Sequence, residues 1–462
     1  MKITPGAKLV LLLLAAFLLR LAAAAWWQDR VGPGFYFGDS DSYWTLGRAI
    51  ATGEPYRFGE AGSRVFRAPG YPTLLAPIFL LGGNHPPVFW GRALGAACGT
   101  LSVLGVWWLA RRLFDSRAGW IAATLAAVYP GAVATSVFVL SEAPFCPLML
   151  ANLALWTAAW QSGTTRRAGW LAAAAGAAAG AAAGAAALLR PSWLLFVPFA
   201  LAAGFILQAS WGKNTGANAE LAAAPARRRM RQPSAKRRAG STANERWSVF
   251  ARGRWRRLLP GLVMLVTMAL VMTPWWIRNA RAVGRFVPTS LEVGASLYDG
   301  LNPQATGGSD MRFASRFLEE ERRRPSNPDE PLEVRLDRRM RTEALAWARS
   351  HPGEVIRLAG VKFLRMWNVW ANEASLSSWP LRLLLMLTYV PLLALGILGA
   401  AKTVRQGWPY WLCWLPAVYF TLLHVVFVSS VRYREPAMLG LVVLAAGLIA
   451  SWRRSAYSSR SA

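Results

Sequence analysis

Residues 8–27 read KLVLLLLAAFLLRLAAAAWW, an apolar run with a lysine at its start and one arginine inside it. A helix that crosses the hydrocarbon core of a bilayer needs about 20 predominantly apolar residues, so this run predicts a membrane-spanning helix. The run also resembles a secretory signal peptide, with residues 21–25 as a cleavage region. We interpret it as a retained helix because many further apolar runs follow it.

Apolar runs of this length recur throughout the 462 residues. The chain is 54% hydrophobic, contains 24 tryptophans and has a mean hydropathy of +0.28, whereas only 16% of its residues are charged. Soluble proteins carry about a quarter charged residues, so this composition excludes a disordered, a collagen-like or an ordinary cytosolic protein. We predict an all-α polytopic membrane protein with ten spanning helices, at about 8–27, 88–110, 118–137, 142–160, 169–189, 192–210, 258–277, 381–400, 409–429 and 436–452.

Basic residues give these helices an orientation, because the cytoplasmic loops of membrane proteins carry an excess of Lys and Arg. The excess lies in the loops that the helix count places on one side: Arg111, Arg112, Arg117, Arg166, Arg167, residues 211–257, Lys402, Arg405, Arg453 and Arg454. We therefore expect both termini in the cytoplasm and two long extracytoplasmic loops, 28–87 and 278–380. A net charge of +29 would by itself suggest a nucleic-acid-binding protein. The basic residues lie at the ends of the predicted spans, however, so we expect no nucleic-acid partner.

The chain divides into three parts. Residues 1–210 form an N-terminal transmembrane module with the first outer loop, and residues 258–462 form a C-terminal module with the second. Between them, residues 211–257 hold 13 Lys and Arg against two glutamates and show no apolar periodicity. This composition predicts a disordered cytoplasmic linker that lies on anionic lipid headgroups.

Shorter patterns refine this outline. Residues 71–81 are apolar but too short to span, which predicts an interfacial or partly re-entrant segment. In the second outer loop, residues 332–350 and 354–367 have the spacing of amphipathic helices. We expect the apolar positions of the first of these helices to form a core: Leu336, Met340, Ala344 and Trp347.

Small and soft residues within the spans have structural explanations. Gly176, Gly180 and Gly184 recur at a four-residue spacing that lets membrane helices approach closely. The three cysteines lie within apolar runs without a CxxC spacing, so we expect buried thiols and no disulfide or thiolate metal site. The three histidines are far apart in the sequence and predict no metal site.

Two aspartates directly after the first span are the first candidates for chemistry. Residues 38–44 read GDSDSYW, which places Asp39 and Asp41 where the protein meets both lipid headgroups and water. A carboxylate there can act as a general base on a substrate hydroxyl. Alternatively, both aspartates precede a helical stretch and are good N-cap residues. The residues alone leave both interpretations open.

Further motifs follow in order along the chain: GRAI at 47–50, RAPGYP at 67–72, LSEA at 140–143, LRP at 189–191, TPWWIRN at 273–279, GRFVP at 284–288, GLNP at 300–303 and RYREP at 432–436. In this order they resemble the polyprenol-phosphate-sugar-dependent glycosyltransferases of the GT-C fold, glycosyltransferase families 39 and 83. The closest groups are the bacterial relatives of protein O-mannosyltransferases and of the lipid A aminoarabinose transferase. The resemblance runs from about residue 10 to residue 450. The chain departs from the pattern at Gly47, in its Asp-x-Asp in place of Asp-Glu, and in the basic segment 211–257.

The resemblance implies a GT-C-like bundle of about ten transmembrane helices and an inverting glycosyltransferase of the cell (inner) membrane. Such an enzyme moves a sugar from a polyprenyl phosphate to a hydroxyl of a protein, a lipid or an envelope glycan, on the extracytoplasmic side and among membrane lipids. The rival classes are a transporter or lipid flippase, and a membrane scaffold without chemistry. Transporters place ionisable residues near the bilayer midplane, whereas the acidic residues here cluster in the outer loops.

The resemblance also implies roles for individual residues. These enzymes use an aspartate of the first outer loop as catalytic base, and the spacing to Tyr43 and Arg48 assigns this role to Asp39, with Asp41 as the alternative. Arginine suits the donor phosphate because its planar fork matches phosphate oxygens. The candidates for this contact, each of which could instead anchor in the headgroups, are Arg67, Arg190, Arg278, Arg432 and Arg434.

Glu142 and Tyr43 are candidates for orienting the acceptor. Glu142 begins a span on the outer side, where an acidic residue is costly and suggests function, although it could also cap the helix. It could bind a divalent metal ion, the one candidate cofactor.

Single cysteines introduced for labelling test the topology. In intact cells, Ala235→Cys in the basic segment should resist a membrane-impermeant maleimide, whereas Ser326→Cys in the second outer loop should react. Labelling of position 235 from outside would contradict the ten-helix topology.

Overall fold

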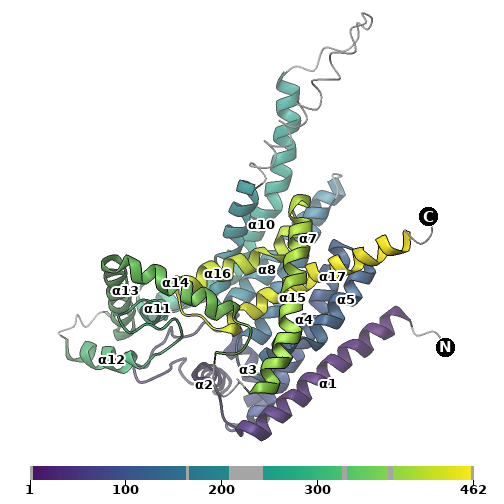
Figure 1. The fold of residues 1–462 in the computed structure, drawn as a ribbon. Helices are drawn as coiled ribbons and strands as arrows, with labels where there is room; N and C mark the ends of the chain where they lie inside the picture. The colour runs from purple at the N-terminus through teal and green to yellow at the C-terminus, as the bar shows by residue number, and fades with distance from the viewer. Residues whose placement is uncertain (1–3, 163–165, 208–242, 325–329, 373–377, 459–462) are drawn as a thin grey trace, which may run out of the picture.

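The computed structural model describes residues 4–162, 166–207, 243–324, 330–372 and 378–458. The regular structure of these residues is helical, apart from one isolated bridge between Phe58 and Ser63. Figure 1 shows long helices packed side by side in a bundle, with shorter helices gathered to one side of it. The prediction of an all-α chain is therefore confirmed.

Within the described ranges, seven helices are long and apolar enough to cross a membrane. They are α1 (Pro5–Val31), α4 (Val88–Leu113), α7 (Glu142–Gln161), α8 (Arg166–Leu189), α10 (Ala243–Val283), α15 (Trp379–Thr403) and α17 (Glu435–Ser458). Taken together, a bent pair of helices, α5 (Ser116–Val128) and α6 (Pro130–Val137), passes the same test of length and composition, with a bend of 53° at the break. The chain is a multi-pass membrane protein.

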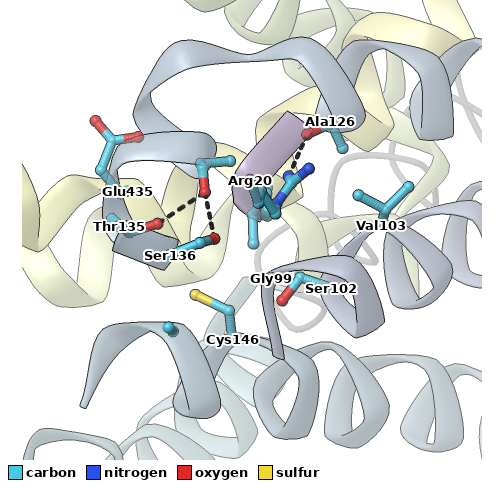
Figure 2. A pocket seen from close by; sticks show the side chains of 12 residues that line it. Arg20, Gly99, Ser102, Val103, Ala126, Thr135, Ser136, Cys146 and Glu435 are labelled. Carbon is cyan, nitrogen blue, oxygen red and sulfur yellow. Dashed lines mark hydrogen bonds between the residues drawn. The ribbon is translucent and has the colours of Figure 1, made fainter. Parts of the chain in front are cut away.

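Arg20, the arginine inside the first apolar run, donates hydrogen bonds to backbone carbonyls at the break between α5 and α6. The carbonyl of Ala126 would accept a helical hydrogen bond from residue 130, but Pro130 has no N–H to donate. Arg20 is 1% exposed and donates to the carbonyl oxygens of Ala126 and Ala127, each at 3.0 Å. Figure 2 shows its guanidinium beside a small cavity that Glu435 also lines.

Two of the ten expected spans correspond to shorter apolar helices in the described residues. The expected span 192–210 corresponds to Pro191–Leu207, and the expected span 409–429 to α16 (Leu415–Val426). Each run begins with a 3₁₀ turn, η1 (Pro191–Trp193) and η4 (Tyr410–Cys413).

The two outer loops hold the shorter helices. The first contains α2 (Gly38–Thr52) and α3 (Gly70–Gly82), and α3 covers the segment predicted to be too short to span. The second contains α11 (Val293–Gly300), α12 (Phe313–Arg323), α13 (Leu332–Ser350) and α14 (Pro352–Trp367). Figure 1 places α11, α12, α13 and α14 together on one flank of the bundle. The predicted core of α13 is confirmed: Met340 and Ala344 are buried, and Leu336 and Trp347 pack against them.

Only part of the predicted basic linker lies within the described residues. Residues 243–257 form the beginning of α10, which therefore starts earlier than the expected span at 258, and residues 211–242 lie outside the described ranges. The three cysteines are free and buried, as predicted.

The glycines of α8 bring its backbone against that of α10. A Cβ at Gly176 would stand 2.8 Å from the carbonyl oxygen of Pro260, and one at Gly180 would meet the backbone of Met264. Contacts this close leave no room for a side chain, so the predicted tight packing is confirmed.

Replacing Gly180 should therefore destabilise the bundle. We expect Gly180→Ala to lower the stability by about 1–3 kcal/mol, because the methyl group would push two backbones apart. Gly169→Ala on the same helix is the control, since a Cβ there would meet nothing within 4 Å; it should be neutral or stabilising by up to about 1 kcal/mol. Thermal unfolding in detergent measures both, and equal midpoints would contradict the packing described.

Candidate active site

The carboxylate of Asp39 lies between two guanidinium groups that come from distant parts of the chain. Its Oδ1 accepts from Arg67 Nη2 at 2.7 Å, and its Oδ2 accepts from Arg432 Nη2 at 2.8 Å. Asp39 belongs to the first turn of α2, Arg67 to the loop before α3, and Arg432 to the 3₁₀ turn η5 (Val431–Arg434) that precedes α17. Both charge-assisted bonds are short, as expected for strong contacts.

Two residues of α2, Ser42 and Tyr43, contact the guanidinium of Arg67 and position it. Ser42, three residues after Asp39, donates its hydroxyl to the carbonyl of Asp39 at 2.7 Å and accepts from Arg67 Nε at 2.9 Å. The guanidinium of Arg67 also lies over the ring of Tyr43, 5.0 Å from its centroid. Residues three and four apart share one helix face, which explains why this short motif can hold one arginine.

Asp41 lies apart from this cluster. It is exposed, and two residues along a helix from Asp39 its side chain leaves on a different face. Among the described residues it forms no salt bridge. The capping interpretation is wrong for both aspartates, because Phe37 occupies the N-cap of α2 and no side chain there bonds to the helix.

Glu142 forms a second acidic centre that shares Arg432. This first residue of α7 is 3% exposed, and its Oε1 lies 2.8 Å from Arg190 Nη1 and 3.8 Å from Arg432 Nε. Arg190 lies between α8 and η1. Because Arg432 reaches both carboxylates, Asp39 and Glu142 belong to one site.

Tyr433 is a platform for the same arginines. Its hydroxyl accepts from Arg432 Nη2 at 2.9 Å, and the guanidiniums of Arg190 and Arg432 lie 5.2 and 4.9 Å from its ring centroid. Within the described structure, Arg190 Nε and Arg432 Nη1 are buried donors without a partner. Buried donors are nearly always bonded, so these two atoms indicate a place for an anionic ligand.

Sequence reasoning missed a third carboxylate, Glu292. It is the N-cap residue of α11, and its Oε2 accepts from Arg67 Nη1 at 2.7 Å. Burial raises the pKa of Glu292 to about 7, although Arg67 opposes this rise. Burial also acts to raise the pKa of Asp39, but Arg67 and Arg432 together outweigh it and hold that pKa well below its usual range. The only local signal for Glu292 is an acidic residue four positions after the GRFVP motif.

Two of the five predicted arginines do not join the cluster. Arg278 donates to the carbonyls of Arg64 at 2.6 Å and Tyr56 at 3.5 Å, and so supports the first outer loop. Arg434 is 2% exposed, donates to the carbonyls of Met366 and Asn368, and lies over the ring of Tyr389. Of the five candidates for the donor phosphate, the structure therefore brings Arg67, Arg190 and Arg432 together and places Arg278 and Arg434 against loop and helix-end carbonyls.

The outer loops are fastened to each other beside the site. Glu333 on α13 is 6% exposed and accepts from the backbone N–H groups of Arg64 and Val65 at 2.9 and 3.0 Å. Leu291 donates from its N–H to the carbonyl of Val65 at 2.8 Å. These bonds fix the segment that leads to Arg67, and they also bring Glu292 next to it.

No group of three or more His, Cys, Asp and Glu side chains that could hold a metal ion occurs in the described part of the chain. Each of Asp39, Glu142 and Glu292 is paired with an arginine instead.

Comparisons with known proteins agree with this architecture. The family model of the dolichyl-phosphate-mannose-protein mannosyltransferases matches residues 67–224, roughly a third of the chain. No curated protein matches the chain.

Three of the solved structures that are similar to this chain represent the match. The archaeal oligosaccharyltransferase AglB from Archaeoglobus fulgidus, in complex with an inhibitory peptide and a dolichol-phosphate, is 14% identical, with a TM-score of 0.53 over 99% of this chain and 51% of its own. The apo form of the Archaeoglobus fulgidus oligosaccharyltransferase is 13% identical, with a TM-score of 0.50 over 95% of this chain and 50% of its own. ArnT from Cupriavidus metallidurans, bound to undecaprenyl phosphate, is 15% identical, with a TM-score of 0.43 over 96% of this chain and 77% of its own.

The chain thus spans about half the length of the oligosaccharyltransferase that it matches. The match to AglB covers nearly every residue of this chain and shows that the chain has the GT-C fold, as predicted.

Proposed function

We propose that the chain is an inverting glycosyltransferase that moves a sugar from a polyprenyl-phosphate donor to a hydroxyl group of a protein, a lipid or an envelope glycan. Both the family match and the GT-C fold support a lipid-phosphate-linked donor. Neither supports the transporter or flippase alternative. We place the reaction on the extracytoplasmic side and both termini in the cytoplasm, on the basic-residue argument given above.

The observation that carries this proposal is a carboxylate held between arginines at one end of the bundle. A sugar phosphate leaves with a growing negative charge, which preorganised donors stabilise in the transition state. Arg190 Nε and Arg432 Nη1 are buried and free to bind phosphate oxygens. Arg432 therefore connects the proposed leaving-group site with the proposed base, Asp39.

The low pKa of Asp39 would make it a weak base while it is bonded to both arginines. A general base works best when its pKa lies near the working pH. Donor binding removes this obstacle, because a phosphate that draws Arg432 away takes a positive partner from Asp39. The carboxylate then gains basicity only after the donor is in place.

The chemical step is a single displacement. The acceptor oxygen bonds to the anomeric carbon from the face opposite the phosphate, while the bond from that carbon to the phosphate oxygen breaks. The electron pair of the broken bond stays on the phosphate, and the hydroxyl proton passes to Asp39. One displacement inverts the configuration at the anomeric carbon. Glu142 and Tyr43 flank this step and are proposed to orient the acceptor.

Asp39→Asn tests the base. The amide keeps the size of the side chain but cannot take a proton, so sugar transfer from a polyprenyl-phosphate sugar by the purified protein should fall by about 10²–10⁴-fold. Asp41→Asn is the matched control, since Asp41 is exposed and lies outside the cluster; it should keep nearly full activity.

Thermal stability of both variants must be measured alongside turnover, since Asp39→Asn also weakens two ion pairs. An active Asp39→Asn protein beside an inactive Asp41→Asn protein would move the base to Asp41. Two active variants would refute a catalytic role for this loop.

A further inference from the structure

The charges of the cluster balance before any donor binds. Three guanidiniums, of Arg67, Arg190 and Arg432, face three carboxylates, of Asp39, Glu142 and Glu292. A sugar phosphodiester would add one negative charge to this partly buried site. Uncompensated charge is costly there, so binding is favoured if one carboxylate becomes neutral.

Of the three carboxylates in the cluster, Glu292 has the fewest arginine partners. Asp39 is bonded to two arginines, and Glu142 is 3% exposed and within 4 Å of two. Glu292 pairs with Arg67 alone, and its side chain is 20% exposed, so a proton from water can reach it. Arg67 in turn uses Nη1 for Glu292, Nη2 for Asp39 and Nε for Ser42.

We propose that Glu292 takes up a proton when the donor phosphodiester binds, and thereby releases Arg67 Nη1 to the phosphate. The inference rests on the proposed function and adds a positioning residue to it. The step is balanced: each ionised Glu292 carboxylate takes one proton from solvent as a monoanionic donor binds, so the uptake approaches one proton per donor above about pH 7 and falls below it. Arg67 stays with Asp39 and Ser42 through its other nitrogens while Nη1 changes partner.

The surroundings of Glu292 fit this exchange. Burial raises its pKa to about 7, so near neutral pH the proton costs little free energy. Arg67 and Asp39 are the charged groups that act on it. On the neighbouring α13, Asp337 is engaged by the N–H of Gly294 and by Arg341, and Glu333 by Arg64. Because the bound donor favours the protonated carboxyl of Glu292, donor affinity should fall as the pH rises through about 7.

Binding of a fixed-charge probe tests the inference directly. The methyl ester of a polyprenyl phosphate is a diester that does not titrate near neutral pH. Calorimetric titration of the full chain at about pH 8, in buffers of different ionisation enthalpy, should show uptake of about one proton on binding. Its Kd should rise about tenfold between about pH 6 and about pH 8. Glu292→Gln, which imitates the protonated carboxyl, should change by less than about twofold over that range and take up fewer protons.

Glu343→Gln is the matched control, because this exposed glutamate of α13 pairs with Arg339 away from the cluster; it should keep the wild-type pH dependence. Wild-type binding without proton uptake, or an unchanged pH slope in Glu292→Gln, would overturn the inference while sugar transfer by the wild type still upholds the proposed function. Absence of both diester binding and sugar transfer would overturn the two together. The proton count of the wild type decides the matter even if the variant fails to fold.

Discussion

The ion pair that joins Asp39 to Arg432 organises the site, because it links residues 393 positions apart in the sequence. Charged groups taken out of water are destabilising unless they are paired and hydrogen-bonded. Asp39 is paired with both Arg67 and Arg432, and Arg432 also lies within 4 Å of Glu142. The helix ends that carry these residues, the start of α2 and the turn before α17, must meet for the cluster to form.

The need of each buried charge for a partner also explains how donor binding could make the site reactive. An arginine bound to a carboxylate can transfer to a phosphate without crossing an apolar region, since both anions would lie beside it. Arg67 and Arg432 are each shared by two carboxylates, so each has an alternative partner when one is lost. The arginines that pair with these carboxylates are therefore the same groups that would bind the donor phosphate.

Much of the fold was predictable because apolar runs and amphipathic spacing are local properties. The helix at 332–350 was predicted with the bounds of α13, and the glycine spacing predicted close packing of α8, although not its partner α10. The 3₁₀ turns that begin two of the apolar runs were not predictable, because such a turn uses the same apolar residues as a span. In the site, the motifs named Asp39, Arg67, Arg190 and Arg432. They could not separate these from Arg278 and Arg434, which bond to backbone carbonyls outside the cluster. Nor could they reveal Glu292, which only the contact between the two outer loops brings to Arg67.

The central claim is that Arg432 leaves Asp39 for the phosphate of the donor. Electron cryomicroscopy of the protein with a bound polyprenyl-phosphate sugar tests it most directly. We predict phosphate oxygens within hydrogen-bond distance of Arg190 and Arg432, and an Asp39 carboxylate that has lost its bond to Arg432 and faces the anomeric carbon. A phosphate bound elsewhere, with Asp39 still bonded to both Arg67 and Arg432, would contradict the account.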